Sequence, residues 1–119
     1  MLRKRLAVVV TSSVTILGGA LATAPAALAH TACNTTARGH GCVNDPHYSA
    51  FVCDDRADNW GVRMHLLLTD GSRPTFGDGN GSADGCGSWH SPDLRKIVQF
   101  QICAGVNGAD SECGPVLNA

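Results

Sequence analysis

The chain has 119 residues, six cysteines and a formal net charge of −1. Three of its nine basic residues precede residue 30, whereas all ten acidic residues follow it, so residues 30–119 carry a charge of −4. This acidic balance, without a cluster of Lys and Arg, argues against nucleic acid and against an anionic membrane surface as partners.

The first 29 residues have the order of a secretory signal peptide. Arg3, Lys4 and Arg5 form a basic start, an apolar run covers 6–21, and Ala-Leu-Ala at 27–29 is a cleavage site of the small-x-small type. We therefore expect a secreted, extracellular protein with no membrane anchor after cleavage. Residues 30–119 then form one small domain.

All six cysteines lie beyond that cleavage site, where an oxidising compartment favours disulfides. No Cys-x-x-Cys pair indicates zinc. Six cysteines allow 15 pairings, and the sequence alone does not select one. Proximity favours Cys33–Cys42 and Cys103–Cys113, which leaves Cys53–Cys86.

Residues 30–47 are polar and without clear periodicity, so we expect an irregular N-terminal segment. Three later segments alternate with period two, which is typical of antiparallel strands with one solvated face. They are 48–53, 62–68 and 97–103. In the last segment, Val98, Phe100 and Ile102 are expected on one face and Gln99 and Gln101 on the other.

Turn residues separate these segments. Asp58-Asn59 follows the first strand, Asp70-Gly71 follows the second, and Asn107-Gly108 follows the third. The stretch 71–93 reads mostly as loop, with one short strand near Thr75, and Pro115 places any final strand at an edge. The predicted fold is all-β: a small antiparallel sandwich or partly open barrel with long loops, covering 48–119 and joined by three disulfides.

The stretch 52–63 contains Cys-Asp-x-Arg-Ala-Asp-x-x-Gly-Val, from Cys53 to Val62. This motif resembles one found in small secreted proteins of actinobacteria, with an apolar strand, a Gly-Cys segment and a late strand after it. Here those are 64–68, 85–86 and 100–103. The resemblance implies export and a disulfide-bonded β fold, and no particular activity.

Ala57-Asp58-Asn59 also leads into an alternating strand. In this it resembles the secreted microbial α-amylase inhibitors, which are small disulfide-bonded β-sandwiches. The inhibitory Trp-Arg-Tyr triplet of that family is absent from this sequence. The resemblance therefore implies the architecture rather than α-amylase inhibition.

Two segments are candidate metal sites, although no cofactor is expected. Calcium prefers hard oxygen ligands, and these recur at every second position of 78–84: Asp78, Asn80, Ser82 and Asp84. Ala83 replaces the turn glycine of an EF-hand loop and Trp89 its last ligand, so a solvated turn is the alternative.

His30 becomes the first residue if cleavage follows Ala29. Its amine and ring would then suit copper, with a second histidine completing the site. Four histidines are available for that role: His40, His47, His65 and His90.

No acid, base and nucleophile stand in a recognisable catalytic context. Ser88, His90 and Asp93 lie within six positions, and we expect them to be solvated polar residues of a loop. We favour a disulfide-stabilised binding module for an extracellular protein, such as an inhibitor of an extracellular enzyme, because a rigid frame lowers the ordering cost of binding. Aromatic and arginine side chains are the usual anchors, and the 71–93 loop offers Arg73, Phe76 and Trp89. The alternatives are a cell-surface structural protein, a copper-binding protein and a small extracellular enzyme.

Overall fold

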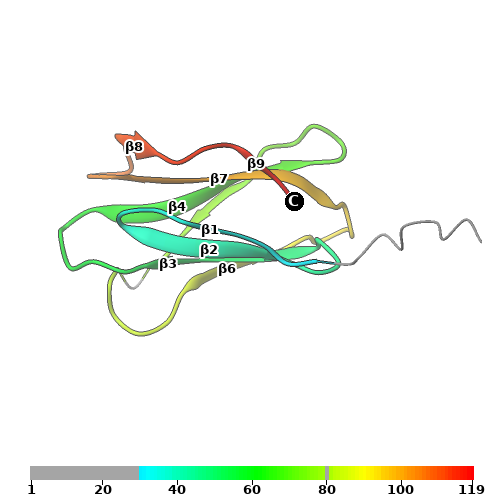
Figure 1. Ribbon diagram of the computed structural model, residues 1–119. Helices are drawn as coiled ribbons and strands as arrows, with labels where there is room; N and C mark the ends of the chain where they lie inside the picture. Colours follow the sequence, from blue (N-terminus) through cyan, green and yellow to red (C-terminus); the bar gives the residue numbers. More distant parts are fainter. Residues whose placement is uncertain (1–29, 80) are drawn as a thin grey trace, which may run out of the picture.

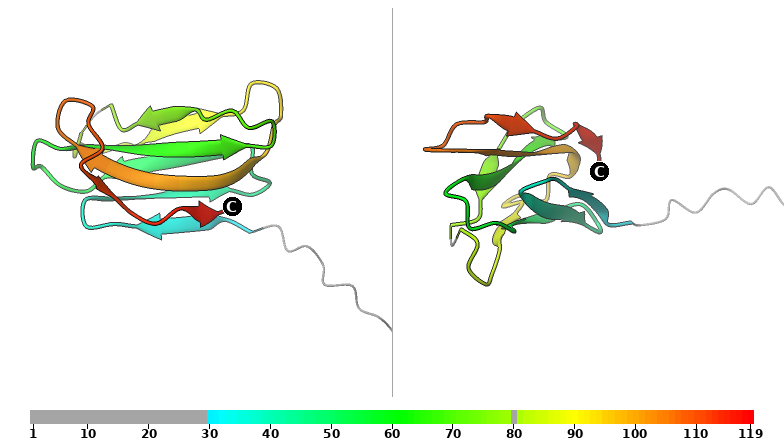
Figure 2. Two further views of the ribbon diagram at one scale, coloured as in Figure 1. Left: turned by 90° about the horizontal axis from the view of Figure 1, so that it is seen from above. Right: turned by 60° about the vertical axis from the view of Figure 1, so that its left-hand side comes forward.

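The computed structural model describes residues 30–79 and 81–119 and shows two antiparallel sheets packed face to face (Figures 1 and 2). Sheet A has the strand order β1-β2-β3-β6, and sheet B has the order β5-β4-β7-β8, with β9 also paired to β7. The signal peptide predicted at 1–29 lies outside the described residues. The strands are β1 (Ala32–Thr35), β2 (Gly39–Asn44), β3 (Ser49–Asp54), β4 (Gly61–Leu68), β5 (Thr75–Gly77), β6 (Gly87–His90), β7 (Ile97–Gly105), β8 (Glu112–Cys113) and β9 (Leu117–Asn118).

Period-two alternation explains the core. On β4, Val62, Met64, Leu66 and Leu68 point inward while the residues between them face outward. The inner faces of both sheets supply the buried side chains, as in other sandwiches. The core cluster comprises Val43, Ala50, Val52, Val62, Met64, Leu66, Leu68, Ile97, Phe100, Ile102 and Ala104. The predicted all-β sandwich is therefore confirmed, and the barrel is not closed.

The expectation for Val98 is wrong. The pairing of β4 with β7 shifts register between Leu67 and Leu68, so that Leu68 pairs with Ile97 and Leu67 with Gln99. Val98 is the extra residue of this β-bulge and is 37% exposed, whereas Ile97 is 1% exposed. The bulge exchanges Ile97 for Val98 in the core and leaves Phe100 and Ile102 facing inward as predicted.

The expectation that residues 30–47 form an irregular segment is also wrong, because this segment contains strands β1 and β2. On β2 the residues that face the core are Gly39, Gly41 and Val43. Two of the three inward positions are glycine, so the strand shows no alternation of apolar and polar side chains. A Cβ atom at Gly41 would lie 2.5 Å from the Phe51 carbonyl oxygen and 2.7 Å from Met64 Cε. Close packing of β2 on its neighbours requires glycine here, and glycine hides the strand from sequence patterns.

The long segment 71–93 holds two strands, of which only β5 was predicted. β6 pairs with β3, with Ala50 opposite Trp89 and Val52 opposite Gly87. Gly87 also lies against the backbone of Gly77 at the end of β5, where any Cβ atom would collide. The edges of the two sheets therefore meet along β5 and β6.

The three disulfides are Cys33–Cys42, Cys53–Cys86 and Cys103–Cys113, the pairs that proximity favoured. Cys33 lies directly opposite Cys42 on β1 and β2, and Cys103 lies opposite Cys113 on β7 and β8. Cys53 on β3 is bonded to Cys86, which directly precedes the neighbouring strand β6. Each bridge therefore joins adjacent segments of a single sheet.

The turns follow the sequence closely. Val106 accepts a backbone hydrogen bond from Ala109, and the two residues between them, Asn107 and Gly108, have φ angles of 54° and 79°. Two positive φ angles define a type I′ turn, which Asn-Gly favours. The final strand is split into β8 and β9 around Pro115, at the edge of sheet B. Within the described part of the chain, no helix is long and apolar enough to cross a membrane.

Candidate functional site

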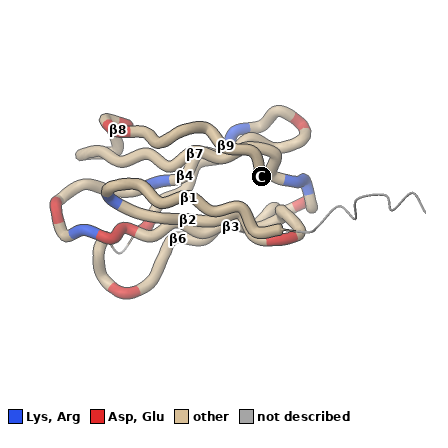
Figure 3. Tube along the Cα trace, in the orientation of Figure 1, with Lys and Arg blue, Asp and Glu red and all other residues tan. Residues whose placement is uncertain are grey.

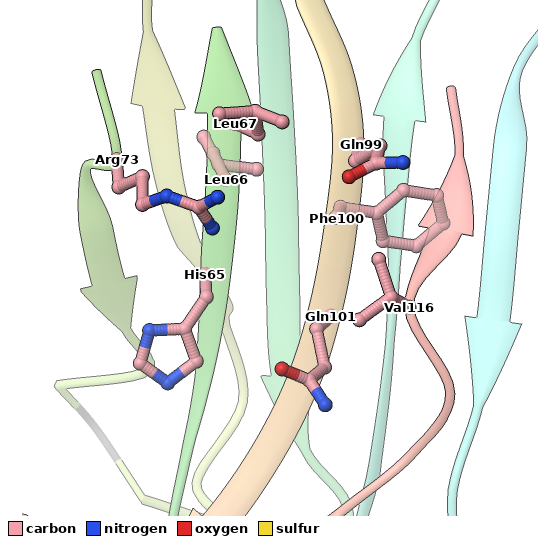
Figure 4. Close-up of a pocket in the computed structure, with 8 residues that line it drawn as sticks. All are labelled: His65, Leu66, Leu67, Arg73, Gln99, Phe100, Gln101 and Val116. Carbon is pink, nitrogen blue, oxygen red and sulfur yellow. The ribbon is translucent and has the colours of Figure 1, made fainter. Parts of the chain in front are cut away.

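The outer face of sheet B carries a shallow hollow of about 250 Å³, counted out to its open mouth (Figure 4). Residues of β4 and β7 form its floor, and Arg73 and Val116 stand on opposite sides of it. The lining residues are His65, Leu66, Leu67, Arg73, Gln99, Phe100, Gln101 and Val116. A cation, two amides and the apolar side chains of Leu67 and Val116 therefore share one small concave surface, whereas the side chains of Leu66 and Phe100 face the core.

Arg73 is placed over this hollow by the backbone on both sides of it. Leu68 donates to the Ser72 carbonyl and Leu66 donates to the Pro74 carbonyl, each at 2.9 Å, so the segment before β5 is held against β4. Figure 4 shows the Arg73 guanidinium extending across β4, above His65 in the view. The cation is thus presented by a fixed backbone rather than by a free loop.

The two glutamines are fixed by the C-terminal segment. The Gln101 amide nitrogen donates to the Gly114 carbonyl at 3.0 Å, and that of Gln99 donates to Asn118 Oδ1 at 3.3 Å. Each side-chain amide has a second N–H and an acceptor oxygen left for a ligand. These groups are therefore oriented before any ligand binds.

Next to the hollow, four polar side chains form a chain across β5, β4 and the 106–111 loop. Thr75 Oγ1 lies 2.8 Å from His65 Nδ1, and His65 Nε2 lies 2.8 Å from Asp110 Oδ2. The other oxygen of Asp110 lies 3.2 Å from Arg63 Nε, and Arg63 also donates to the carbonyls of Gly108 and Ala109. Arg63 and His65 together hold the loop against the sheet.

The two contacts of His65 differ in kind. Its Nδ1 is within hydrogen-bond distance of the Thr75 hydroxyl, which can donate to it, whereas its Nε2 lies close to Asp110 without forming a hydrogen bond. A hydroxyl, an imidazole and a carboxylate in this order are the components of nucleophilic catalysis. The arrangement supplies a base for the Thr75 hydroxyl at the edge of sheet B.

Arg73 differs from the arginines that hold the ends of the sandwich together. Charged residues gather at these ends (Figure 3). There Arg38 pairs with Glu112 at 2.8 Å and with Asp58, and Arg95 pairs with Asp93 and Asp70.

These ion pairs shift pKa values in both directions. Hydrogen bonding to Glu112 and Asp58 raises the pKa of Arg38 against the lowering effect of burial. Hydrogen bonding to Asp93 and, to a smaller extent, to Asp70 raises the pKa of Arg95. Burial raises the pKa of the Asp58 carboxyl, but the Trp60 N–H and Arg38 outweigh burial, and the net shift is downward. Among the described residues, Arg73 has no carboxylate partner.

Of the three predicted binding residues, only Arg73 lies on this surface. Phe76 and Trp89 are partly buried and pack against the core from the edge strands β5 and β6. The loop expected around Trp89 is a correction, because Trp89 lies on strand β6. Both aromatic residues cover the side of the sandwich where the two sheets meet, and their role in binding stays a prediction.

Three of the four candidate calcium ligands, Asp78, Ser82 and Asp84, lie among the described residues. Asp78 is only 8% exposed, and its Oδ2 accepts the Asp54 backbone N–H at 3.0 Å, so this carboxylate joins the start of the loop to the end of β3. Ser82 and Asp84 are exposed, and Asn80 lies outside the described residues. Asp78 thus has a structural role in joining these segments, and calcium binding at this loop stays a prediction.

One other group in the described ranges brings three metal-ligand types together: His65, Cys103 and Asp110. The sulfur of Cys103 is bonded to Cys113 and is not a thiolate ligand. Asp110 and His65 already pair with Arg63 and Thr75. This group is therefore better described as a network of polar contacts than as a metal site.

The structure brings His30 to His47 and separates it from the other predicted partners. The two rings meet edge to face, with centroids 5.3 Å apart. His40 pairs with Asp55 at 2.8 Å, His65 belongs to the network on sheet B, and His90 is exposed on β6. Asp93 accepts a hydrogen bond from Arg95.

Sequence patterns did not single out four residues of this surface: Thr75, Gln99, Gln101 and Asp110. The polar face predicted for the last long strand already contained both glutamines, and the period-two alternation predicted for 62–68 puts His65 on the face opposite Met64 and Leu66. The approach of Asp110 to His65 depends on how the 106–111 loop folds back, and no sequence spacing encodes that contact.

A scan against protein-family models found no match, and searches of curated proteins and of solved structures found none either. The resemblances to secreted actinobacterial proteins and to α-amylase inhibitors therefore remain predictions.

Proposed function

We propose that the protein is an exported binding module that recognises a carboxylate-bearing segment of an extracellular protein through the hollow around Arg73. The observation that carries this proposal is the placement of Arg73. Its guanidinium has no carboxylate partner among the described residues, although the mature sequence has ten acidic residues and six basic ones. A guanidinium group binds a carboxylate in a bidentate manner.

The surroundings of Arg73 support the same reading. Leu67 and Val116 offer apolar contact beside the cation, and Gln99 and Gln101 offer oriented amides. Small sites commonly combine an apolar lining with a few fixed polar groups. A Glu or Asp side chain next to an apolar residue of the partner fits this combination, and an inhibitor of an extracellular enzyme is one form that such a module takes.

The experiment is an NMR titration of the mature domain with two acetylated, amidated hexapeptides that differ only in Glu against Gln beside a leucine. We expect the Glu peptide to shift the side-chain amide signals of Gln99 and Gln101, and to bind about tenfold more tightly than the Gln peptide, as charge-assisted bonds should. Arg73→Ala should abolish the difference.

Arg56→Ala is the matched control. Arg56 is exposed and makes no ion pair among the described residues, so it tests for a general effect of positive charge. Equal binding of the two peptides, or an equal loss in Arg56→Ala, would contradict the proposal. The same variants then enter an inhibition assay against purified extracellular hydrolases, where inhibition should require Arg73.

A second function, hydrolysis through an acyl-enzyme, is favoured by one observation: His65 is hydrogen-bonded to Thr75 on one side and lies 2.8 Å from Asp110 on the other. Thr75 would be the nucleophile, His65 the base and Asp110 the residue that orients it. The test is labelling with a fluorophosphonate probe followed by mass spectrometry. A covalent adduct on Thr75 that is lost in His65→Gln supports this function, and an absence of any adduct on Thr75 rejects it.

A further inference from the structure

His30 and His47 lie side by side where the chain enters sheet A. Their rings are 5.3 Å apart between centroids with an interplanar angle of 88°, and His47 Nε2 lies 3.0 Å from the carbonyl oxygen of His30. In the register of β1 on β2, Ala32 pairs with Val43. Following both strands outward brings His30 to the turn that holds His47.

The backbone imposes the position of His47. Its N–H donates to the Asn44 carbonyl, and its own carbonyl accepts from the Ile97 N–H at 2.8 Å, so the turn is tied to both β2 and β7. His47 has a φ of 76°, in the left-handed region that non-glycine residues seldom adopt. Such backbone strain persists only where the surrounding structure enforces it, and it is common at functional sites.

Cleavage of the signal peptide would place an amine nitrogen beside the imidazole rings of His30 and His47. If the signal peptide is removed after Ala29, as the Ala-Leu-Ala site predicts, the nitrogen of His30 becomes the N-terminal amine of the chain, next to its own imidazole. The amine and the ring nitrogen of one histidine form a chelate, and the neighbouring imidazole of His47 is available as the next ligand. Among divalent metals of the first transition row, Cu²⁺ binds such nitrogen ligands most tightly.

We propose that the mature N-terminus forms a copper site in which the amine and imidazole of His30 and the imidazole of His47 coordinate one Cu²⁺ ion. The metal replaces the contact between His47 Nε2 and the His30 carbonyl. The structure selects His47 from the four histidines that the sequence offered. This site lies on sheet A and is separate from the hollow on sheet B, so the two proposals stand or fall independently.

The experiment starts with N-terminal sequencing of the exported protein, and a first residue other than His30 overturns the proposal. The mature domain is then titrated with Cu²⁺ against a competing chelator, and the nitrogen ligands are counted by electron paramagnetic resonance. We expect one copper ion per chain, and a loss of affinity of about tenfold or more in His30→Ala and in His47→Ala, because each substitution removes a ligand.

Two controls separate a built site from general histidine binding. His90→Ala removes an exposed histidine on β6 and should leave the affinity unchanged. A form that retains residues 26–29 keeps both rings but moves the amine away, and it should bind more weakly than the mature form. Equal affinity of the mature form, the extended form and His47→Ala overturns the proposal.

Discussion

The two sheets resemble each other on their inner faces and differ on their outer faces. Both contribute alternating apolar residues to the same core. Outside, sheet A carries the Cys33–Cys42 bridge beside Phe51, whose ring meets His40 edge to face. Sheet B instead carries the hollow and the network of Arg63, His65 and Asp110. The outer face of sheet B also carries a disulfide, Cys103–Cys113, which lies beside this network. The two outer faces therefore differ in their aromatic contact and in their polar side chains.

The links between the sheets differ from those within them. Every disulfide joins adjacent segments of one sheet. Between the sheets, contact is made by the apolar core, by ion pairs at the ends, where Arg38 of the β1–β2 turn reaches Glu112 on β8, and by hydrogen bonds such as that from the Asp54 N–H to Asp78. The disulfides therefore stabilise each sheet, whereas the pairing of the sheets depends on burial, charge and hydrogen bonds.

The largest expected effect comes from the core. Phe100 is 1% exposed, so Phe100→Ala should lower the free energy of unfolding by about 3–5 kcal/mol through lost burial and a residual cavity. Val98→Ala is the matched control, because Val98 is exposed on the same strand. Urea unfolding measures both, and comparable losses would contradict the assigned bulge.

The next largest effect on stability concerns the two disulfides of sheet A, which should contribute unequally. Cys53–Cys86 spans 33 positions and Cys33–Cys42 spans nine, so chain entropy predicts about 4 and about 3 kcal/mol for their contributions to stability. The paired substitution of Cys53 and Cys86 by serine should then lower Tm more than that of Cys33 and Cys42. Thermal unfolding of the two double variants decides it, and the reverse order would show that the N-terminal hairpin is not peripheral.

The sequence predicted those parts of the fold in which large apolar side chains occupy the buried positions. Large apolar residues on β4 reveal its core face directly, and cysteine spacing favoured the observed bridges. Strand β2 was not predicted, because Gly39 and Gly41 face the core and pack through their backbone rather than through a side chain. Val98 and Ile97 are both apolar, so the alternation did not disclose the bulge that exchanges them.

The candidate site was less predictable than the fold. Arg73 was named from its residue type alone, and Phe76 and Trp89 were named for the same reason although they pack inward. Whether an aromatic residue on a short edge strand faces the core depends on strand pairing, as β6 shows. Contacts such as that of His65 with Asp110 depend on loops folding back, which local sequence does not record.

A smaller effect tests the charged link between the sheets. The Arg38 guanidinium lies 3.7 Å from the centre of the Trp60 ring and pairs with Asp58 and Glu112. Arg38→Ala should lower Tm by a few degrees, because it removes a cation–π contact and leaves two carboxylates near each other. Arg56→Ala should change Tm much less.

Added salt distinguishes this link from the core. The ion-pair part of the Arg38 contribution should shrink as ionic strength rises, whereas the loss in Phe100→Ala should not. Thermal unfolding at low and high salt measures both. A salt-independent loss in Arg38→Ala would show that the residue acts by packing on Trp60 alone.

The smallest effect concerns acid stability at the other end of the sandwich. Hydrogen bonds from the Ser72 hydroxyl and N–H, together with Arg95, lower the pKa of Asp70 from 3.8 to about 2. Between these values the unfolded chain binds a proton that the folded protein does not, so the stability that Asp70 contributes is present above about pH 4 and is lost as the pH falls toward 2. Asp70→Asn should therefore flatten the decline of stability in that window and destabilise the protein slightly at neutral pH. Asp84→Asn removes the same charge from an exposed loop and should leave the slope unchanged. Urea unfolding across pH 2–5 distinguishes the two variants, and an unchanged slope in Asp70→Asn would show that the Ser72 and Arg95 contacts do not hold this end of the sandwich in solution.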